Sequence, residues 1–432
     1  MKNYALLAAF AAIPFILSAG EPASVFISVD QSDAQVRPAD ITGKCLRRAL
    51  GKNSFVVSDT HDLYRLKKAY DVKALLWQPQ GEYVVPEDYY DNVKNRINAM
   101  RAEVYAVTGD ENDIILPVVF GTLSHDSKRY SPIVEAAQFQ LAAELPNVYL
   151  LDLSNTTMAA DSVTFDAAST EYVGKLTYNK LVDLDLVKGQ RVDAVVPQPR
   201  NDISEQLTIY RPTAPNGKAL VVCPGGGYDH HAMEWEGTRV GEWLSENGYT
   251  CAVLKYRFPE GKSNVPTDDS RAAVRYFRSH ADSLGIDADK VGIMGFSAGG
   301  HLAASTSTLA DSTSRPDFQV LMYPVISMEE GVTHGGSRKN LIGREPSQIL
   351  VDRYSADKQV GPDTPRAIMI LSADDKVVIP ENSLRYFNAL ISNKVPVEMH
   401  IYPTGGHGWG MRDRVPFKAQ WQDELLKWLG SF

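Results

Sequence analysis

The segment 291–301, VGIMGFSAGGH, constrains the fold more than any other part of the chain. It joins an apolar run to the pattern G-x-S-x-G and then to an alanine-rich stretch. A serine on a sharp turn between a strand and a helix needs small neighbours, and Gly295 and Gly299 meet that need. The turn also places Ser297 at a helix N-terminus, whose dipole favours a developing negative charge. We therefore predict a strand, a turn and a helix, with Ser297 as a nucleophile.

A serine hydroxyl is a weak nucleophile, so a base and an orienting carboxylate must accompany it. His407 lies in a glycine-rich stretch, 403–410, that follows the last predicted strand. The stretch after the preceding predicted strand offers Asp374 and Asp375. The chain order serine, aspartate, histidine is that of α/β-hydrolases. His407 is therefore the predicted base, and one of the two aspartates is its partner.

Three glycines supply the remaining requirement of acyl transfer, a pair of backbone N–H donors for the oxyanion. An apolar run leads into PGGGY at 224–228, and only glycine lets the backbone approach a tetrahedral intermediate closely. We expect the N–H groups of Gly226 and Ala298 to form the oxyanion hole, with Gly225 as a further donor.

Four other histidines compete with His407 for the role of base: His230, His231, His301 and His334. His301 is four residues beyond Ser297 on the same predicted helix, so it cannot face the nucleophile from another loop. We predict that it packs or supports the site. His230 and His231 follow the glycines, where they either contact substrate or form a surface pair.

Strands and helices alternate through the C-terminal half. Predicted strands cover 206–210, 219–222, 250–256, 290–295, 318–323, 366–371 and 395–402. Predicted helices cover 236–247, 268–283, 298–309, 381–392 and 418–429. This alternation predicts a parallel sheet covered by helices. The stretch 328–361 has weak periodicity and is the expected cover of the active site.

The N-terminal half has the same α/β patterning. Predicted strands cover 24–29, 73–77, 113–120 and 147–153, and predicted helices cover 86–104, 131–145 and 168–184. Periodicity is lost near residue 190, among glycine and proline. We expect a signal peptide at 1–20, one domain at 21–190, a linker at 191–204 and a second domain at 205–432.

The C-terminal domain resembles the α/β-hydrolase esterases of the acetyl-xylan and feruloyl esterase group. The resemblance rests on PGGGY (224–228), WEGTRVGEWLSENGY (235–249), YRFP (256–259), DDSRAAVRYFR (268–278), GFSAGGHLA (295–303), ADDKVVIPENS (373–383) and GGHGWG (405–410). It implies a triad of Ser297, Asp375 and His407. Asp375 is preferred over Asp374 because the family's acid is followed by two residues and a Val-Pro-like sequence. Tyr228 and Trp409 are the expected substrate contacts.

The N-terminal domain resembles SGNH-type carbohydrate esterases related to sialate O-acetylesterases. The similar stretches are VFISVDQSD (25–33), WQPQGE (77–82) and DSVTFDAAS (161–169). Three chemical positions differ from that family, since Asp30 replaces a glycine, Asp33 an asparagine and Thr164 the catalytic histidine. We therefore expect a three-layer α/β/α domain that retains the scaffold without the chemistry.

Composition limits the partners. The first 20 residues carry Lys2, an apolar run and a small-residue end, which are typical of a secretory signal. No later apolar run approaches the roughly 18 residues of a membrane span. The net charge of −9 includes no basic cluster that would attract nucleic acid. The three cysteines can form at most one disulfide. We expect a periplasmic or secreted protein without a membrane anchor.

Together these features predict an exported serine esterase that removes acetyl groups, and secondarily feruloyl groups, from an acylated polysaccharide such as xylan. No metal or cofactor is required by this chemistry. Two alternatives remain open, a peptidase of the prolyl-oligopeptidase type and a carbohydrate-binding protein with a vestigial hydrolase domain. The first usually carries a propeller, for which no repeat precedes residue 205. The oligomeric state is left open.

Overall fold

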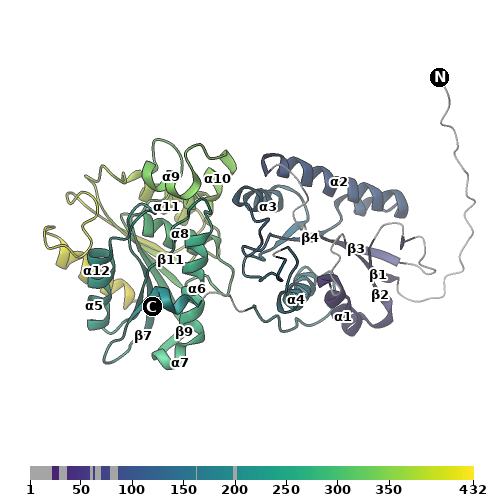
Figure 1. Cartoon of the computed structure of the whole chain (residues 1–432), viewed down its shortest axis with the longest axis horizontal. Coiled ribbons are helices and arrows are strands. Elements are labelled where there is room, and N and C mark those ends of the chain that lie inside the picture. Colours follow the sequence, from purple (N-terminus) through teal and green to yellow (C-terminus); the bar gives the residue numbers. More distant parts are fainter. Residues whose placement is uncertain are drawn as a thin grey trace, which may run out of the picture. The chain divides into compact units, whose positions relative to one another are not determined.

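Two separate sheets organise the chain (Figure 1). The computed structural model describes residues 22–28, 37–58, 62–63, 70–77, 86–161, 163–197 and 202–432. Unit 1 comprises Met1–Tyr83, Asp91–Arg129 and Leu141–Pro197, and unit 2 comprises Val84–Tyr90, Tyr130–Gln140 and Gln198–Phe432. The predicted signal peptide lies outside the described residues.

The first sheet has five parallel strands in the order β2-β1-β3-β4-β5. The strands are β1 (Ala23–Ser28), β2 (Ser54–Val57), β3 (Tyr70–Trp77), β4 (Val118–Gly121) and β5 (Val148–Leu151). The helices are α1 (Pro38–Leu50), α2 (Tyr89–Thr108), α3 (Pro132–Glu144) and α4 (Ala167–Asp183), with short 3₁₀ turns at Gly51–Asn53, Pro86–Asp88 and Glu111–Ile115. Figure 1 shows α1 and α4 on one face of this sheet and α2 on the other, so the predicted three-layer arrangement is present.

Three elements of unit 1 differ from the sequence prediction. Helix α1 and the edge strand β2 were not predicted, and the predicted strand 113–120 was wrong in its first half. Residues Glu111–Ile115 form a 3₁₀ turn because the Asp110 side chain accepts the N–H of Asn112 and caps it. Beyond α4, the side-chain amide of Asn179 pairs with both the N–H and the C=O of Val192.

The second sheet has seven strands in the order β12-β11-β10-β9-β7-β8-β6. Six are parallel, but β6 pairs with β8 in the antiparallel sense, so the sheet is mixed at this edge. The strands are β6 (Leu207–Tyr210), β7 (Gly217–Cys223), β8 (Thr250–Leu254), β9 (Ile286–Phe296), β10 (Phe318–Met322), β11 (Arg366–Ser372) and β12 (Val397–Tyr402).

Helices cover both faces of this sheet. They are α5 (Arg239–Glu246), α6 (Val265–Ser279), α7 (Ala281–Leu284), α8 (Ala298–Leu309), α9 (Gly335–Ile342), α10 (Gln348–Arg353), α11 (Glu381–Ser392) and α12 (Lys418–Leu429), with a π-helical turn at Glu234–Thr238 and a 3₁₀ turn at Ala356–Lys358. Buried residues of α5 and α12 share one apolar cluster, and those of α6, α8 and α11 share another. Successive residues of β7 join opposite clusters, which explains its unbroken apolar run.

The site is placed by the carboxyl ends of the parallel strands in unit 2. The glycines at 225–227 follow β7, Ser297 follows β9, Asp375 follows β11 and His407 follows β12. Because parallel strands end at the same edge of a sheet, these residues come together there.

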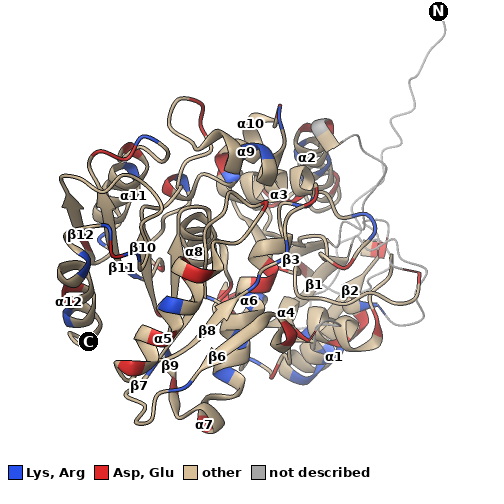
Figure 2. Ribbon diagram, turned by 60° about the vertical axis from the view of Figure 1, so that its left-hand side comes forward, with Lys and Arg blue, Asp and Glu red and all other residues tan. Residues whose placement is uncertain are grey.

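The remaining sequence predictions concern the cysteines, the distribution of charge and membrane-spanning segments. Cys45, Cys223 and Cys251 are buried and unpaired. Acidic and basic positions are interspersed along the helices of both units (Figure 2). Within the described ranges, no helix combines the length and the apolar character needed to span a bilayer.

Candidate active site

Ser297 occupies the turn between β9 and α8. Its φ of 51° and ψ of −117° form a conformation that residues other than glycine rarely adopt. The N–H of Ser297 donates to Met322 C=O at 3.0 Å, and its C=O accepts the N–H of Val325 at 3.0 Å. These bonds to the end of β10 and the residues beyond it hold the strained turn in place.

The glycines beside Ser297 are required by close packing. A Cβ atom on Gly295 would lie 2.0 Å from the carbonyl oxygen of Gly299, and one on Gly299 would lie 2.1 Å from that of Cys223. Real Cβ atoms do not approach so closely, so no larger residue fits either position. The crowding that the G-x-S-x-G pattern predicts is present.

A series of hydrogen bonds joins the three predicted triad residues. Ser297 Oγ lies 2.8 Å from His407 Nε2, and His407 Nδ1 lies 2.6 Å from Asp375 Oδ2. In the tautomer with its proton on Nδ1, the neutral ring donates to Asp375 and accepts from the Ser297 hydroxyl. This geometry suits removal of the serine proton by His407.

Asp375 and Asp374 have different partners. The Asp375 side chain is 1% exposed, and its Oδ1 accepts the N–H groups of Val377 and Val378 at 2.9 and 3.0 Å. Asp374 instead accepts the N–H of Gly406 at 2.8 Å. Asp375 is therefore fixed toward the His407 ring, whereas Asp374 holds the backbone next to it.

The glycines at 225–227 lie directly beside Ser297. A Cβ atom on Gly225 would approach the Ser297 Cβ to 3.0 Å, and one on Gly226, whose φ is +130°, would meet the His230 carbonyl oxygen at 2.0 Å. The N–H of Gly225 donates to Glu236 Oε2 at 2.8 Å. The prediction that Gly225 donates to the oxyanion is therefore wrong, because its hydrogen is already used. Gly226 and Ala298 remain the candidate donors.

Tyr228 supports the site from inside and does not face substrate. Its side chain is 2% exposed, and its hydroxyl lies 2.8 Å from Nδ1 of His301. His301 Nε2 donates to the Tyr354 carbonyl at 2.7 Å, so Nδ1 accepts the Tyr228 hydroxyl. Burial lowers the pKa of His301 to about 4, against a weaker opposing effect of the Tyr354 bond. The substrate role predicted for Tyr228 is wrong, whereas the supporting role of His301 agrees with the structure.

Trp409 is also part of the framework. Its side chain is fully buried and its indole N–H donates to Ser372 Oγ at 3.0 Å. The ring packs among the aromatic side chains of Tyr323, Phe417 and Trp421. The predicted substrate contact is wrong here too, because a side chain without exposed surface cannot touch a ligand.

The segment 328–361 lies against the glycines, as expected of an active-site cover. Asn340 of α9 donates its side-chain N–H to Gly227 C=O at 2.9 Å. The ring of His334 caps α9 by accepting the N–H of Ser337, and its Cε1 lies 3.9 Å from where a Gly227 Cβ would be. Burial, and secondarily repulsion from His407, lowers the pKa of His334. His334 is therefore favoured as a neutral residue next to the site.

Sequence reasoning missed two residues, Glu236 and Tyr323. Glu236 is 3% exposed and accepts hydrogen bonds from the Gly225 N–H and the Tyr323 hydroxyl. The one signal in the sequence is the acidic residue of WEG (235–237), which follows the glycine triplet. An acidic residue at that place is typical of the exposed first turn of a helix. Among the described residues, no group of three or more His, Cys, Asp or Glu side chains is arranged to hold a metal ion.

In unit 1, Thr164 stands where the resemblance places a catalytic histidine. Its N–H and hydroxyl both donate to the Asp161 carboxylate, at 2.9 and 2.8 Å. Asp30, Ser32 and Asp33 lie outside the described residues, as does 78–82. In the described part of the third block, Thr164 is thus bonded to Asp161, and Asp166 caps the start of α4.

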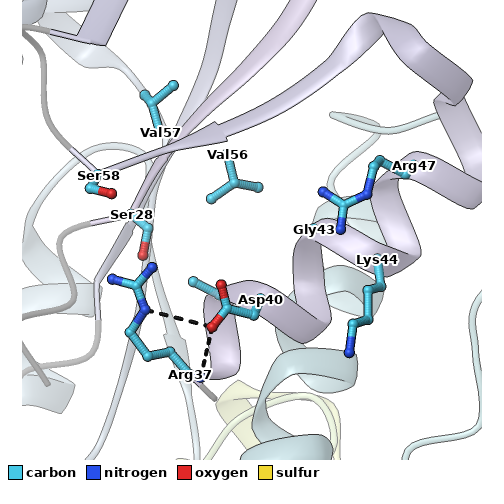
Figure 3. A pocket seen from close by; sticks show the side chains of 10 residues that line it. Ser28, Arg37, Asp40, Gly43, Lys44, Arg47, Val56, Val57 and Ser58 are labelled. Carbon is cyan, nitrogen blue, oxygen red and sulfur yellow. Dashed lines mark hydrogen bonds and ion pairs between the residues drawn. The ribbon is translucent and has the colours of Figure 1, made fainter. Parts of the chain in front are cut away.

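A pocket of about 310 Å³ opens between α1 and β2 (Figure 3). Arg37, Lys44 and Arg47 line it together with one carboxyl group, Asp40, which accepts the Arg37 backbone N–H at 2.8 Å. Two of the described lining residues are serines, Ser28 and Ser58. The described part of the lining therefore carries mainly positive charge.

Comparison with protein families matches both halves of the chain. Residues 220–411 match the alpha/beta hydrolase fold family. Residues 57–183 match the family described as carbohydrate esterase, sialic acid-specific acetylesterase. The two resemblances and the two-domain α/β fold predicted from the sequence are confirmed.

Individual relatives match parts of the chain. An acetylxylan esterase from Xylanibacter ruminicola is 36% identical over 235 residues, covering 54% of this chain and 49% of the relative. Endo-1,4-beta-xylanase B from Butyrivibrio fibrisolvens is 34% identical over 204 residues, covering 44% and 32%. The chain thus spans less than half the length of either relative. A solved acetyl ester-xyloside bifunctional hydrolase from Caldicellulosiruptor lactoaceticus is 36% identical, with coverage of 52% and 87% and a TM-score of 0.49.

Proposed function

We propose that this chain, which joins an α/β-hydrolase domain to a sialic acid-specific acetylesterase-type domain, is a serine carbohydrate esterase. Its proposed substrate is an acylated plant cell-wall polysaccharide such as xylan. Removal of acetyl groups is the main proposed activity, and removal of feruloyl groups is a secondary one. The observation that carries the proposal is the hydrogen-bond series Ser297–His407–Asp375 beside the glycines at 225–227. The acetylxylan esterase relative supports the substrate class.

Acylation follows from this geometry. His407 Nε2 takes the hydroxyl proton as Ser297 Oγ attacks the ester carbonyl, and Asp375 stabilises the imidazolium that forms. The carbonyl oxygen becomes negatively charged, and the N–H groups of Gly226 and Ala298 donate to it. The intermediate collapses when His407 gives its proton to the leaving sugar oxygen, which leaves acyl-Ser297.

Deacylation reverses these roles with water. His407 takes a proton from water as the water oxygen attacks the acyl carbon, and the same N–H groups stabilise the second oxyanion. The proton then returns to Ser297 Oγ as the carboxylic acid leaves. Water is the only co-reactant, so each cycle restores the free enzyme.

The N-terminal domain is proposed to have no hydrolase activity of its own. A hydroxyl cannot act as a base at neutral pH, and that of Thr164 is already bonded to Asp161. We also propose that the protein is exported, on the strength of the signal-like composition of its first 20 residues.

The proposal is tested by incubating the purified full chain and a Ser297→Ala variant with acetylated xylan, methyl ferulate and a dipeptide amide. We expect acetate release to dominate and to fall on the order of 10⁴-fold in the variant. Faster release of amine than of acetate would make the protein a peptidase. Binding of xylan without release of any acid would make it a carbohydrate-binding protein.

A further inference from the structure

One buried carboxyl group contacts both loops that carry the proposed catalytic groups. Glu236 Oε2 accepts the N–H of Gly225 at 2.8 Å, and Glu236 Oε1 accepts the hydroxyl of Tyr323 at 2.9 Å. The Tyr323 oxygen in turn accepts the N–H of Gly410 at 2.9 Å. Gly225 belongs to the glycine loop, 224–228, and Gly410 to the histidine loop, 403–410. A path of three hydrogen bonds therefore joins the two loops.

The backbone around Glu236 is shaped to reach both loops. Glu236 lies in the π-helical turn Glu234–Thr238, a wider turn that is often found at functional sites. A Cβ atom on Gly410 would lie 2.5 Å from the Trp235 carbonyl oxygen and 3.1 Å from Glu236 Cγ. The Trp235 carbonyl also accepts the N–H of Met411 at 3.0 Å. The histidine loop is thus packed directly onto this turn.

Tyr323 adds contacts on the other side of the path. Its ring lies edge-to-face with the His407 ring at a centroid distance of 5.0 Å and with Trp409 at 4.7 Å. Its backbone has a φ of +36°, which non-glycine residues rarely adopt. Tyr323 follows β10, next to the turn that holds Ser297. The ring and the hydroxyl of Tyr323 are therefore held in a fixed position relative to His407.

The Tyr323 ring also packs in the apolar core, but in the described part of the chain the Glu236 carboxylate and the Tyr323 hydroxyl bond only to each other and to the two loops. Burying a carboxyl group is costly unless its oxygens are bonded, and an apolar side chain would fill the same space at lower cost. Burial raises the pKa of Glu236, while its bonds to Tyr323 and Gly225 and the charge of His407 act in the opposite direction. The carboxylate form accepts both donors at once, which fits the contacts observed.

We propose that Glu236 and Tyr323 are positioning residues, which fasten the glycine loop to the histidine loop and so hold the Gly226 N–H and the His407 ring in register around Ser297. The inference rests on the ester hydrolysis proposed above. Acyl transfer needs the oxyanion donor and the base in place together, and a misplacement of about 1 Å can lower the rate about 100-fold. Loosening the path should therefore lower kcat and leave the binding of ground-state substrate unchanged.

The decisive variant is Tyr323→Phe, which keeps the ring and removes only the hydroxyl. Its matched control is Tyr386→Phe, because Tyr386 is also fully buried and donates its hydroxyl to a buried side chain, Gln319 Oε1, at 3.1 Å. Tyr386 lies on α11, in the apolar cluster on the other face of the sheet. Tyr323→Phe loses two buried hydrogen bonds, those to Glu236 and from Gly410, whereas Tyr386→Phe loses the one to Gln319. Both variants should therefore lose thermal stability, Tyr323→Phe the more.

Kinetics on p-nitrophenyl acetate separate positioning from stability. We expect Tyr323→Phe to lower kcat about 10- to 100-fold with KM unchanged, and Tyr386→Phe to leave both unchanged. Glu236→Gln should retain more activity than Glu236→Ala, because the amide oxygen can still accept from Gly225 and the amide N–H₂ can donate to Tyr323. A Tyr323→Phe variant with wild-type kcat, or an equal loss in Tyr386→Phe, overturns the proposal.

Amide hydrogen exchange provides a test that does not require turnover. Peptides that contain Gly410 should exchange faster in Tyr323→Phe than in wild type or Tyr386→Phe, because the Gly410 N–H loses its acceptor. Unchanged exchange in Tyr323→Phe contradicts the link between the loops. If wild type fails to hydrolyse any ester, the proposed function fails, and hydrogen exchange alone still decides whether the loops are fastened in this way.

Discussion

Ser297 and His407 are 110 residues apart in the sequence, yet Oγ of the first lies 2.8 Å from Nε2 of the second. The contact exists because β9 and β12 point the same way in one sheet, so that the loops following them meet at one edge. Ser297 itself is only 8% exposed. The reacting hydroxyl is therefore held next to its base in a largely enclosed position.

The two neighbouring aspartates should differ in their effect on rate. Asp375→Asn replaces the acceptor of the His407 Nδ1–H bond and should lower kcat on the order of 10⁴-fold. Asp374→Asn is the matched control, because this side chain only accepts the Gly406 N–H from an exposed position, and it should have a much smaller effect. Steady-state kinetics with an aryl acetate checks both variants. A larger loss of kcat in Asp374→Asn than in Asp375→Asn would show that Asp374, and not Asp375, is the triad carboxylate.

Gly226 should tolerate no side chain. In Gly226→Ala the new Cβ would lie 2.0 Å from the His230 carbonyl oxygen, so the loop must move and the N–H with it. Loss of one oxyanion donor typically lowers kcat by about 10²- to 10³-fold.

The control for the conformational cost alone is Gly217→Ala. Gly217 also has a positive φ, +88°, but nothing lies within 4 Å of its Cβ position, and it begins β7 at the opposite end from the site. This variant should lose about 1 kcal/mol of stability and keep wild-type kcat. Equal kcat in Gly226→Ala and Gly217→Ala would show that the Gly226 N–H is not an oxyanion donor.

His301 should make the stability of the fold dependent on pH. Its pKa is about 4 when folded, below the ordinary value of about 6.5. Between these values the unfolded chain binds a proton that the folded chain does not, so the free energy of unfolding falls as pH decreases from about 6.5 to about 4, by up to about 3 kcal/mol. Thermal unfolding at pH 7 and pH 5 should show a larger drop in Tm for wild type than for His301→Gln. Parallel drops would show that His301 does not titrate in this way.

The N-terminal domain should contribute no ester hydrolysis. Ser297→Ala should abolish acetate release from acetylated xylan, and a further Ser32→Ala change should have no effect, because Thr164 cannot serve as a base. Acetate assays on the two single variants and the double variant are the measurement. Residual release in Ser297→Ala that disappears in the double variant would make this domain a second active esterase.

The strongest sequence predictions were those in which local pattern and tertiary role agree. Helices α8, α11 and α12 match their predicted bounds residue for residue. In α8 and α12 the pattern is continuous from the first turn to the last, and in α8 the serine turn also fixes the start. The G-x-S-x-G pattern was equally informative, since the steric reason for each glycine is local.

The wrong site predictions have a different cause, because each depends on a contact with a residue from another part of the sequence. Whether the Gly225 N–H is free depends on Glu236, and whether Tyr228 faces substrate depends on His301, 73 residues away. The glycine-rich surroundings of Trp409 are typical of a surface loop, but aromatic residues from other elements enclose its ring. The edge strand β2 was missed because it has only four residues, of which three are half-buried.

The most direct test of the central claim is to identify which residue a fluorophosphonate labels in the folded full-length chain. This reagent reacts with a serine only where a base activates the hydroxyl and an oxyanion hole holds the adduct. Mass spectrometry of the digested protein should place the adduct on Ser297, with labelling lost in His407→Ala and retained in Asp374→Asn. An unlabelled protein, or an adduct on another serine such as Ser32, would contradict the account.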